Sequence, residues 1–264
     1  RQVGKQSLKE TLGGIPMHRF AIDTAAHSEV GIKVDGCIDE PVWARTPYYD
    51  NMIVAVPGTG EVAEYKTEIR LIATERGLFV SASMKQPLDS LTKRLTPRDQ
   101  FIDRDTFGIT IDPSGQGLFA YWFIIALGDA VMDGKVLPER RYSNDWDGPW
   151  LGKSATHEAG WSVEFYLPWS MLNLPAAEGQ RTLGFAASRQ VSSRNQRYQW
   201  PGHSYASPQF VTALNSMSVE GVSPRRQWSL IPYVSSTLDY ATSDQDARAG
   251  PVSYTHLTLP TTRL

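Results

Sequence analysis

Apolar and polar residues alternate along many short runs of this chain, which is typical of strands that bury one face. The runs over residues 69–73 and 78–84 lie on either side of Glu75-Arg76-Gly77, so they predict a hairpin. The runs over 106–111 and 118–126 flank an Asp-Pro-Ser-Gly turn sequence and predict a second hairpin.

Further alternating runs cover residues 161–167 and 183–187, whereas helical signals are confined to single turns. These turns are expected at Asp39–Ala44 and Trp169–Leu172, with Asp39 and Ser170 as cap or first-turn residues. Many short strands with almost no helix predict an all-β fold, an antiparallel β-sandwich.

The two ends of the chain differ from this pattern. Residues 1–29 are polar and lack a sustained period, which indicates a linker or N-terminal extension with a short strand at Arg19–Ile22. The sandwich is expected over residues 30–222. Residues 252–264 resemble the translation of a sequencing adapter, so we expect them to be non-native and the natural protein to continue past Pro251.

In the stretch Trp228–Tyr240, apolar residues occupy mostly every second position, and an aromatic residue stands at each end. This is the signature of a single strand of an outer-membrane barrel. An ordinary edge strand has the same parity, and Pro232 within the run favours that alternative on pattern alone.

Composition excludes several classes of protein. The chain has 264 residues with 26 Lys plus Arg against 28 Asp plus Glu, and these charges are scattered, so nucleic acid is not an expected partner. No apolar run approaches the length of a membrane-spanning helix. The single cysteine, Cys37, excludes an intramolecular disulfide, and we expect it to be a small buried residue.

Four segments in order carry a family resemblance. They are Val34-Asp35-Gly36-Cys37-Ile38-Asp39-Glu40-Pro41-Val42-Trp43, the strand pair over 67–84, Asp105-Thr106-Phe107-Gly108-Ile109-Thr110-Ile111-Asp112-Pro113, and Gly160-Trp161-Ser162-Val163-Glu164-Phe165-Tyr166-Leu167-Pro168-Trp169. Together they resemble carbohydrate-binding module family 9. The resemblance implies a β-sandwich that binds oligo- or polysaccharides without catalysis.

The continuation of the chain is similar to a subgroup in which this module precedes a bacterial outer-membrane barrel. The segments Asn144–Trp150, Gln199–Pro201 and Arg225–Tyr233 carry this similarity. It implies that residues 223–251 are the first strand of a truncated barrel. It also implies a location at the periplasmic face of, or within, the outer membrane, and a role in polysaccharide catabolism.

Aromatic platforms are expected in a saccharide site, because a pyranose ring packs its C–H bonds on an indole while its hydroxyls take polar partners. The best candidates are Trp146 and Trp150, which stand in a turn-like segment beside Asn144 and Asp145. Trp122 alternates with Tyr121 and Phe123, so it lies on the face of its strand that is expected to contact solvent, and it is a further candidate. The alternative is that these indoles belong to the core.

A mixed-charge loop around Arg98 could hydrogen-bond sugar hydroxyls, although such charge runs are usually solvated surface. The resemblance also implies structural calcium, for which residues 99–112 and 129–133 are rich in oxygen ligands. No regular calcium loop is present, so no metal ligand is named. We identify no enzyme motif; His157-Glu158 lacks the second histidine of a zinc protease motif.

Two alternatives to sugar binding stay open. The domain could be a structural, plug-like periplasmic part of a barrel protein. It could also belong to a glycoside hydrolase, which would require a carboxylate pair in a cleft.

Overall fold

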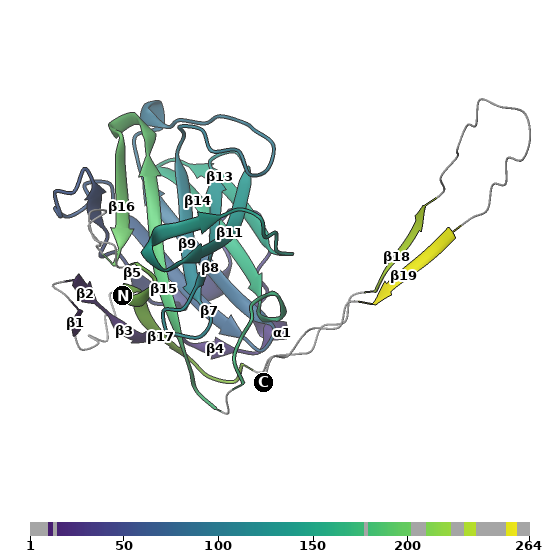
Figure 1. Cartoon of the computed structure of the whole chain (residues 1–264). Coiled ribbons are helices and arrows are strands. Elements are labelled where there is room, and N and C mark those ends of the chain that lie inside the picture. The colour runs from purple at the N-terminus through teal and green to yellow at the C-terminus, as the bar shows by residue number, and fades with distance from the viewer. Residues whose placement is uncertain are drawn as a thin grey trace, which may run out of the picture. The chain divides into compact units, whose positions relative to one another are not determined.

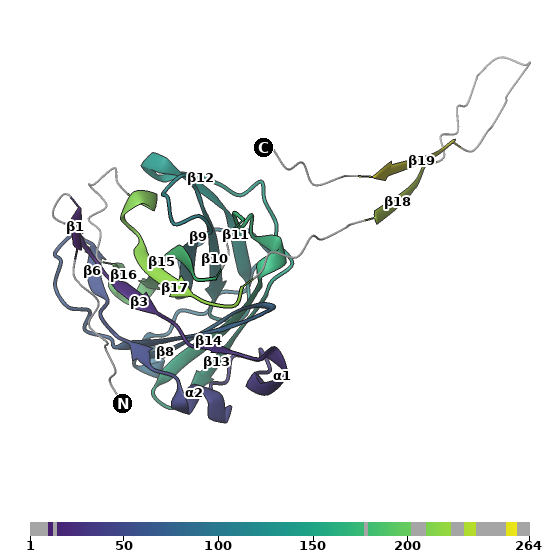
Figure 2. The ribbon, with the colours of Figure 1, turned by 90° about the horizontal axis from the view of Figure 1, so that it is seen from below.

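The computed structural model describes residues 10–12, 15–176, 179–201, 210–222, 230–235 and 252–257. The chain divides into one unit over Arg1–Pro224 and a second over Arg225–Leu264. Within the first unit, two sheets pack face to face (Figures 1 and 2), so the predicted all-β sandwich is confirmed. The short strands β1 (Glu10–Leu12) and β2 (Ile15–Met17) form a separate pair.

The larger sheet contains nine described strands. Its path runs through β12 (Arg141–Ser143), β11 (Val131–Leu137), β10 (Ala120–Ala126), β9 (Thr106–Asp112), β15 (Arg181–Val191), β16 (Gln196–Trp200) and β6 (Ile53–Val56). Beyond this path, β17 (Asn215–Val219) pairs with β15, and β3 (Arg19–Ala21) pairs with β17 in parallel.

The smaller sheet contains six described strands. They are β13 (Leu151–His157), β14 (Gly160–Pro168), β8 (Gly77–Lys85), β7 (Thr67–Thr74) and β4 (Thr24–Ala25), with β5 (Tyr48–Tyr49) also paired to β7. Both predicted hairpins are confirmed, as β7–β8 in this sheet and β9–β10 in the larger one.

Helices are short. They are α1 (His27–Val30), α2 (Pro41–Arg45) and the 3-10 turns η1 (Leu88–Ser90), η2 (Pro138–Arg140), η3 (Trp169–Met171), η4 (Ser192–Arg194) and η5 (Val211–Ala213). The prediction of Asp39 as a cap was wrong. Pro41 begins α2 and Glu40 occupies the N-cap position, because proline fits the first helical turn without needing a donor.

The segment before residue 30 contributes strands to both sheets. The pairing of β3 with β17 confirms the short strand expected at Arg19–Ile22, and β4 pairs in parallel with β7 of the other sheet. The sandwich therefore begins at Arg19, earlier than the alternation of residues indicates, because isolated strands of two or three residues leave no readable period.

The inward faces of the two sheets form the main core, which includes Phe107, Phe123 and Phe165. The outward face of the smaller sheet is covered by α1 and α2, where Trp43 packs with Ile72 and Phe79.

One buried carboxylate, Glu164 on β14, ties the first family motif to the last. Glu164 Oε2 accepts hydrogen bonds from the backbone N–H groups of Asp35 and Gly36, at 3.1 and 3.0 Å. Its Oε1 accepts one from Trp43 Nε1 at 2.9 Å. Cys37 lies in this connection and is exposed, so the expectation of a buried cysteine was wrong. Its backbone N–H donates to Asp35 in a polar turn, which leaves the thiol outside the core.

The second unit is described through two strands. β18 (Leu230–Ser235) pairs antiparallel with β19 (Val252–Leu257). Part of the strand expected over Trp228–Tyr240 is thus present, and its remaining residues lie outside the described ranges. Among the described residues, no helix has the length and apolar character needed to span a membrane.

Candidate functional site

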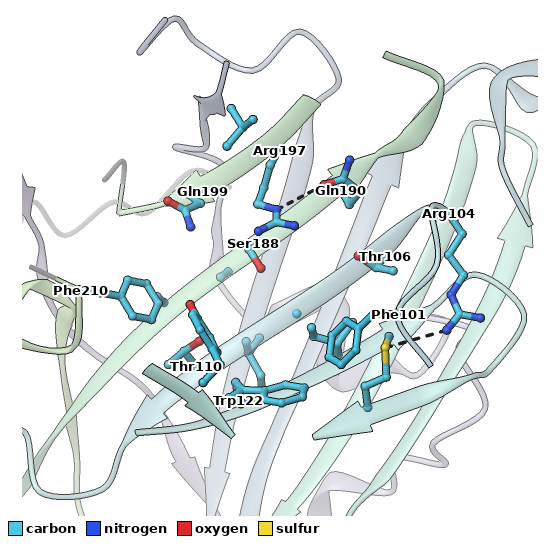
Figure 3. Close-up of a pocket in the computed structure, with 18 of the residues that line it drawn as sticks. Phe101, Arg104, Thr106, Thr110, Trp122, Ser188, Gln190, Arg197, Gln199 and Phe210 are labelled. Carbon is cyan, nitrogen blue, oxygen red and sulfur yellow. Dashed lines mark hydrogen bonds between the residues drawn. The ribbon is translucent and has the colours of Figure 1, made fainter. Parts of the chain in front are cut away.

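The outward face of the larger sheet carries a cavity of about 770 Å³ (Figure 3). Its base is formed by β9, β10, β15 and β16, and residues from the connecting segments line its sides. The cavity therefore lies on the opposite side of the sandwich from α1 and α2.

Small side chains on the outward parity of neighbouring strands create the space. Side chains alternate along β10, so Trp122 and Ile124 point outward while Phe123 belongs to the main core. The facing positions on β9 and β15 are Gly108 and Ser188. A Cβ atom on Gly108 would lie 2.8 Å from Ile124 Cγ1, which is closer than packed carbon atoms approach.

The Trp122 indole is held firmly in this face. It is 4% exposed, and its Nε1 donates to the carbonyl of Lys135 at 3.1 Å. Gly134 on β11 makes room for it, since a Cβ there would lie 2.6 Å from the ring. The ring centroids of Phe101 and Tyr142 lie 5.8 and 6.4 Å from that of Trp122. Both of these rings are more than half exposed at the cavity.

Polar groups complete the lining. Hydroxyls and amides come from β9, β15, β16 and the loops: Thr106, Thr110, Ser143, Asn144, Ser188, Gln190, Asn195 and Gln199. Arg197 on β16 lies three strands from Trp122 and, by the register of these strands, level with Ala126, four residues further along β10, so the two Cα atoms are about 20 Å apart. Its Nε donates to Gln190 Oε1 at 3.3 Å, as drawn in Figure 3. Such a mixture of aromatic rings and neutral hydrogen-bonding groups is typical of small-molecule sites.

Arg104 organises the loop that presents Phe101. Its guanidinium is fully buried and donates to the carbonyls of Arg94 and Gln100, both at 2.8 Å. It also donates to Thr96 Oγ1 at 2.7 Å. Burial lowers the pKa of Arg104, because the charged form loses hydration. These bonds close the loop over residues 94–104 and fix where Phe101 stands.

Two of the predicted site residues line the cavity and four lie elsewhere. Trp122 and Asn144 belong to the lining. Trp150 is 7% exposed and stacks on Phe165 in the core, with 5.7 Å between ring centroids. Trp146 is half-buried and packs against Tyr121 at 4.5 Å, on the core side of β10. The exposed Asp145 bonds to Ser143 Oγ and closes a local turn.

The sixth predicted residue, Arg98, lies among three carboxylates. Its guanidinium bonds to the fully buried Asp133 and to Asp147, and it lies 3.4 Å from Asp99. Asp133 also accepts from Gly148 N and Trp150 Nε1, at 2.8 and 3.0 Å. Burial raises the pKa of Asp133 despite these donors.

The same cluster is where the predicted calcium would find its oxygen ligands. Carboxylate oxygens of Asp99, Asp133 and Asp147 lie within 4.8 Å of one another. The guanidinium of Arg98 already contacts all three carboxylates and offsets one of their charges, and a calcium ion there would face a cation in direct contact with its ligands. The donor set does not fit calcium while Arg98 occupies it.

Sequence reasoning missed most of the cavity lining. The outward parity of β9 and β15 reads Thr106, Gly108, Thr110 and Ala186, Ser188, Gln190, which is small and polar over two neighbouring strands. Small side chains on two neighbouring strands leave space above the sheet, so this sequence pattern indicates a recessed surface. The loop residues Phe101 and Phe210 had no comparable signal, because their position depends on tertiary packing.

Comparison with known proteins supports the same fold. No protein-family model matches the chain, and no curated protein matches it. Among solved structures, a family 9 carbohydrate-binding module from Caldicellulosiruptor kristjanssonii in complex with cellotriose is 14% identical, with a TM-score of 0.51. The match covers 78% of this chain and 95% of the module. The corresponding glucose complex gives the same identity and TM-score and covers 78% of this chain and 98% of the module.

A putative carbohydrate-binding protein from Bacteroides uniformis is 11% identical, with a TM-score of 0.60. The match covers 76% of this chain and 98% of that protein. Identities this low show a shared fold. The chain therefore contains a domain with the β-sandwich fold of family 9 carbohydrate-binding modules.

Proposed function

We propose that this domain is a non-catalytic saccharide-binding module and that the cavity on the larger sheet is its binding site. The observation that carries the proposal is a recessed face that combines exposed rings at Phe101 and Tyr142, backed by the buried indole of Trp122, with a set of hydroxyl and amide groups. A pyranose packs its C–H face on such rings and directs its hydroxyls to the polar groups. The sugar complexes of the structural neighbours support this reading.

The described lining favours binding over hydrolysis. A glycosidase requires two carboxyl groups about 5 to 9.5 Å apart. Among the described lining residues, Asp103 is the one carboxylate, and the buried Glu164 lies with the smaller sheet. The hydrolase alternative therefore lacks its carboxylate pair in this cavity.

The proposal extends to the surroundings of the domain. The parity of Trp228–Tyr240 and the subgroup resemblance support a module that continues into an outer-membrane barrel and serves polysaccharide catabolism at the cell envelope. The plug-like alternative shares this location but would bind no sugar. Saccharide binding by the isolated chain therefore distinguishes the two.

The experiment is isothermal titration of the full chain with glucose-, xylose- and galactose-based oligosaccharides. The test variant is Ser188→Leu, which adds a larger, apolar side chain to the base of the cavity. Its control is Thr182→Leu, on the same strand and parity but outside the lining. We expect saturable binding that Ser188→Leu reduces at least tenfold and Thr182→Leu leaves unchanged. Binding that both variants retain would place the site elsewhere.

A further inference from the structure

One row of residues crosses the larger sheet at the base of the cavity. Four lining residues stand side by side in it, one on each of β10, β9, β15 and β16: Ile124, Gly108, Ser188 and Gln199. Three strand spacings separate its ends, so the Cα atoms of Ile124 and Gln199 are about 14 Å apart. Between these ends stand a glycine and a serine, which leave room for one sugar ring above Gly108.

The polar end of this row is Gln199. The residue is 5% exposed, and its Oε1 is buried without a hydrogen-bond partner among the described residues. A buried polar group without a partner destabilises a folded protein, so one in the wall of a cavity calls for an explanation. The last torsion of a glutamine side chain is broad, and the amide can therefore turn its carbonyl or its NH2 group toward a ligand.

The opposite end of the row is apolar. Ile124 pairs across the sheet with Met132, which also lines the cavity. The exposed ring of Phe101 lies at the same end, 5.8 Å between centroids from Trp122, the neighbouring outward residue on β10. Figure 3 shows Phe101 and Gln199 on opposite sides of the cavity. A ligand hydroxyl placed against these apolar side chains would lose hydration without gaining a hydrogen bond from them.

A pyranose ring has edges that match the two ends of the row. Across the ring from the C2–C3 bond lies the C5–O5 bond, and C5 carries C6. A ring that lies over Gly108 with its C2 and C3 hydroxyls toward Gln199 therefore turns C6 toward Ile124. The amide can donate to one of these hydroxyls and accept from the other.

We propose that the cavity selects a 6-deoxy sugar, with its C2 and C3 hydroxyls at Gln199 and its C6 methyl group against Ile124 and Phe101. This inference rests on the proposed saccharide-binding function and specifies its ligand class. A methyl group gains from burial against these side chains, whereas a hydroxymethyl group would leave its hydroxyl without a partner there. Selectivity then comes from the substituent at C5 in addition to the ring hydroxyls.

The test compares sugars that differ only at C6. Calorimetric titration of the full chain uses the methyl glycosides of D-fucose and D-galactose, of D-quinovose and D-glucose, and of L-rhamnose and L-mannose. The first member of each pair carries a C6 methyl group and the second a hydroxymethyl group. We expect the methyl member of at least one pair to bind about tenfold more tightly than its partner. The pair that shows this difference identifies the ring configuration.

Variants of Ile124 test the apolar end. Ile124→Thr keeps a β-branched side chain but offers a hydroxyl, so it should reduce the preference for the methyl member to about threefold or less. Ile124→Val keeps this end apolar and should retain most of the preference. Circular dichroism confirms that both variants are folded. A preference that Ile124→Thr leaves unchanged would overturn the placement of C6.

Gln199→Met tests the polar end, because it removes the amide at similar side-chain length. It should lower the affinity for both members of the preferred pair about tenfold. The urea midpoint should not fall, since the buried Oε1 has no partner among the described residues. The control, Gln116→Met, changes an exposed glutamine outside the lining and should alter neither quantity. A lower midpoint with unchanged affinity would make Gln199 a structural residue and overturn its role in binding.

The outcomes separate this inference from the proposed function. Binding of oligosaccharides that Ser188→Leu reduces, with no preference for the methyl member of any pair, would overturn the 6-deoxy selectivity and leave the saccharide function standing. Absence of binding to every oligosaccharide and methyl glycoside would overturn both.

Discussion

Replacing Trp150 with alanine should destabilise the sandwich by about 3–5 kcal/mol, the usual cost of removing a large buried aromatic side chain. The indole is 7% exposed, stacks on Phe165 and donates from Nε1 to the buried Asp133 at 3.0 Å. Trp150→Phe keeps a ring in the core but removes that donor. Its expected cost is about 1.5–3 kcal/mol, the range for a hydrogen bond to a charged group.

The pH dependence of the Trp150→Phe variant provides a second readout. Burial already raises the pKa of Asp133 above 3.8, and loss of the indole donor raises it further. The folded state then binds the proton more tightly than the unfolded state, so stability is greatest at acid pH and falls as pH rises through the folded pKa. The difference between wild type and variant should therefore be smallest at acid pH and grow toward neutrality.

Urea unfolding followed by far-ultraviolet circular dichroism measures both effects without relying on the altered indole. The same proteins are titrated with saccharide under native conditions. A Trp150→Ala variant that loses less than about 1 kcal/mol but no longer binds saccharide would refute the core assignment. That result would return Trp150 to the ligand-binding role that its loop context predicts.

Three further predictions concern the connection that precedes α2. Gly36→Ala should cost at least about 2 kcal/mol in urea unfolding, because φ is +90° and the new Cβ would lie 2.5 Å from the Ser154 carbonyl carbon. Gly31→Ala, at φ +58° with open space, should cost only about 1 kcal/mol; equal losses would contradict the clash. Burial raises the pKa of Glu164 to about 7, so the folded state holds its proton more tightly and stability should fall between about pH 4.5 and 7. Glu164→Gln should abolish that fall, and an unchanged profile would assign it to another group. Cys37 is exposed and should react with a thiol reagent at one equivalent in the native chain; protection until unfolding would contradict its placement.

The fold could be predicted from sequence because its signals are local. Alternation along β7, β8, β9 and β10 marks one buried face on each strand, and the turn residues between them mark the hairpins. Strand β4 escaped prediction, and so did the parallel pairing of the predicted strand β3 with β17, since the partners lie far along the chain and both strands are too short to show a period.

The candidate site was harder to predict, because the sequence alone does not distinguish an aromatic residue that packs in a core from one that contacts a ligand. Trp146 and Trp150 stand in a loop rich in turn residues, yet Tyr121 and Phe165 of the sandwich pack against them. Trp122 stands on an ordinary strand and points outward beneath the cavity, where neighbouring side chains leave only 4% of it exposed. The order of the strands in the sheets decides which side chains cover an indole. The alternation of residues along a single strand does not contain that order.

The parallel pairing of β3 with β17 gives the sandwich a mechanical clamp. Ser216 N donates to the carbonyl of His18 at 2.8 Å, and Ile22 N donates to that of Ser218 at 3.1 Å. The two strands run in the same direction, so the chain enters this pair at one end and leaves it at the other. Tension applied through the flanking segments would slide β3 along β17 and load these bonds together, whereas antiparallel ends would be unzipped one bond at a time. A domain built in this way resists extension when force passes along the chain.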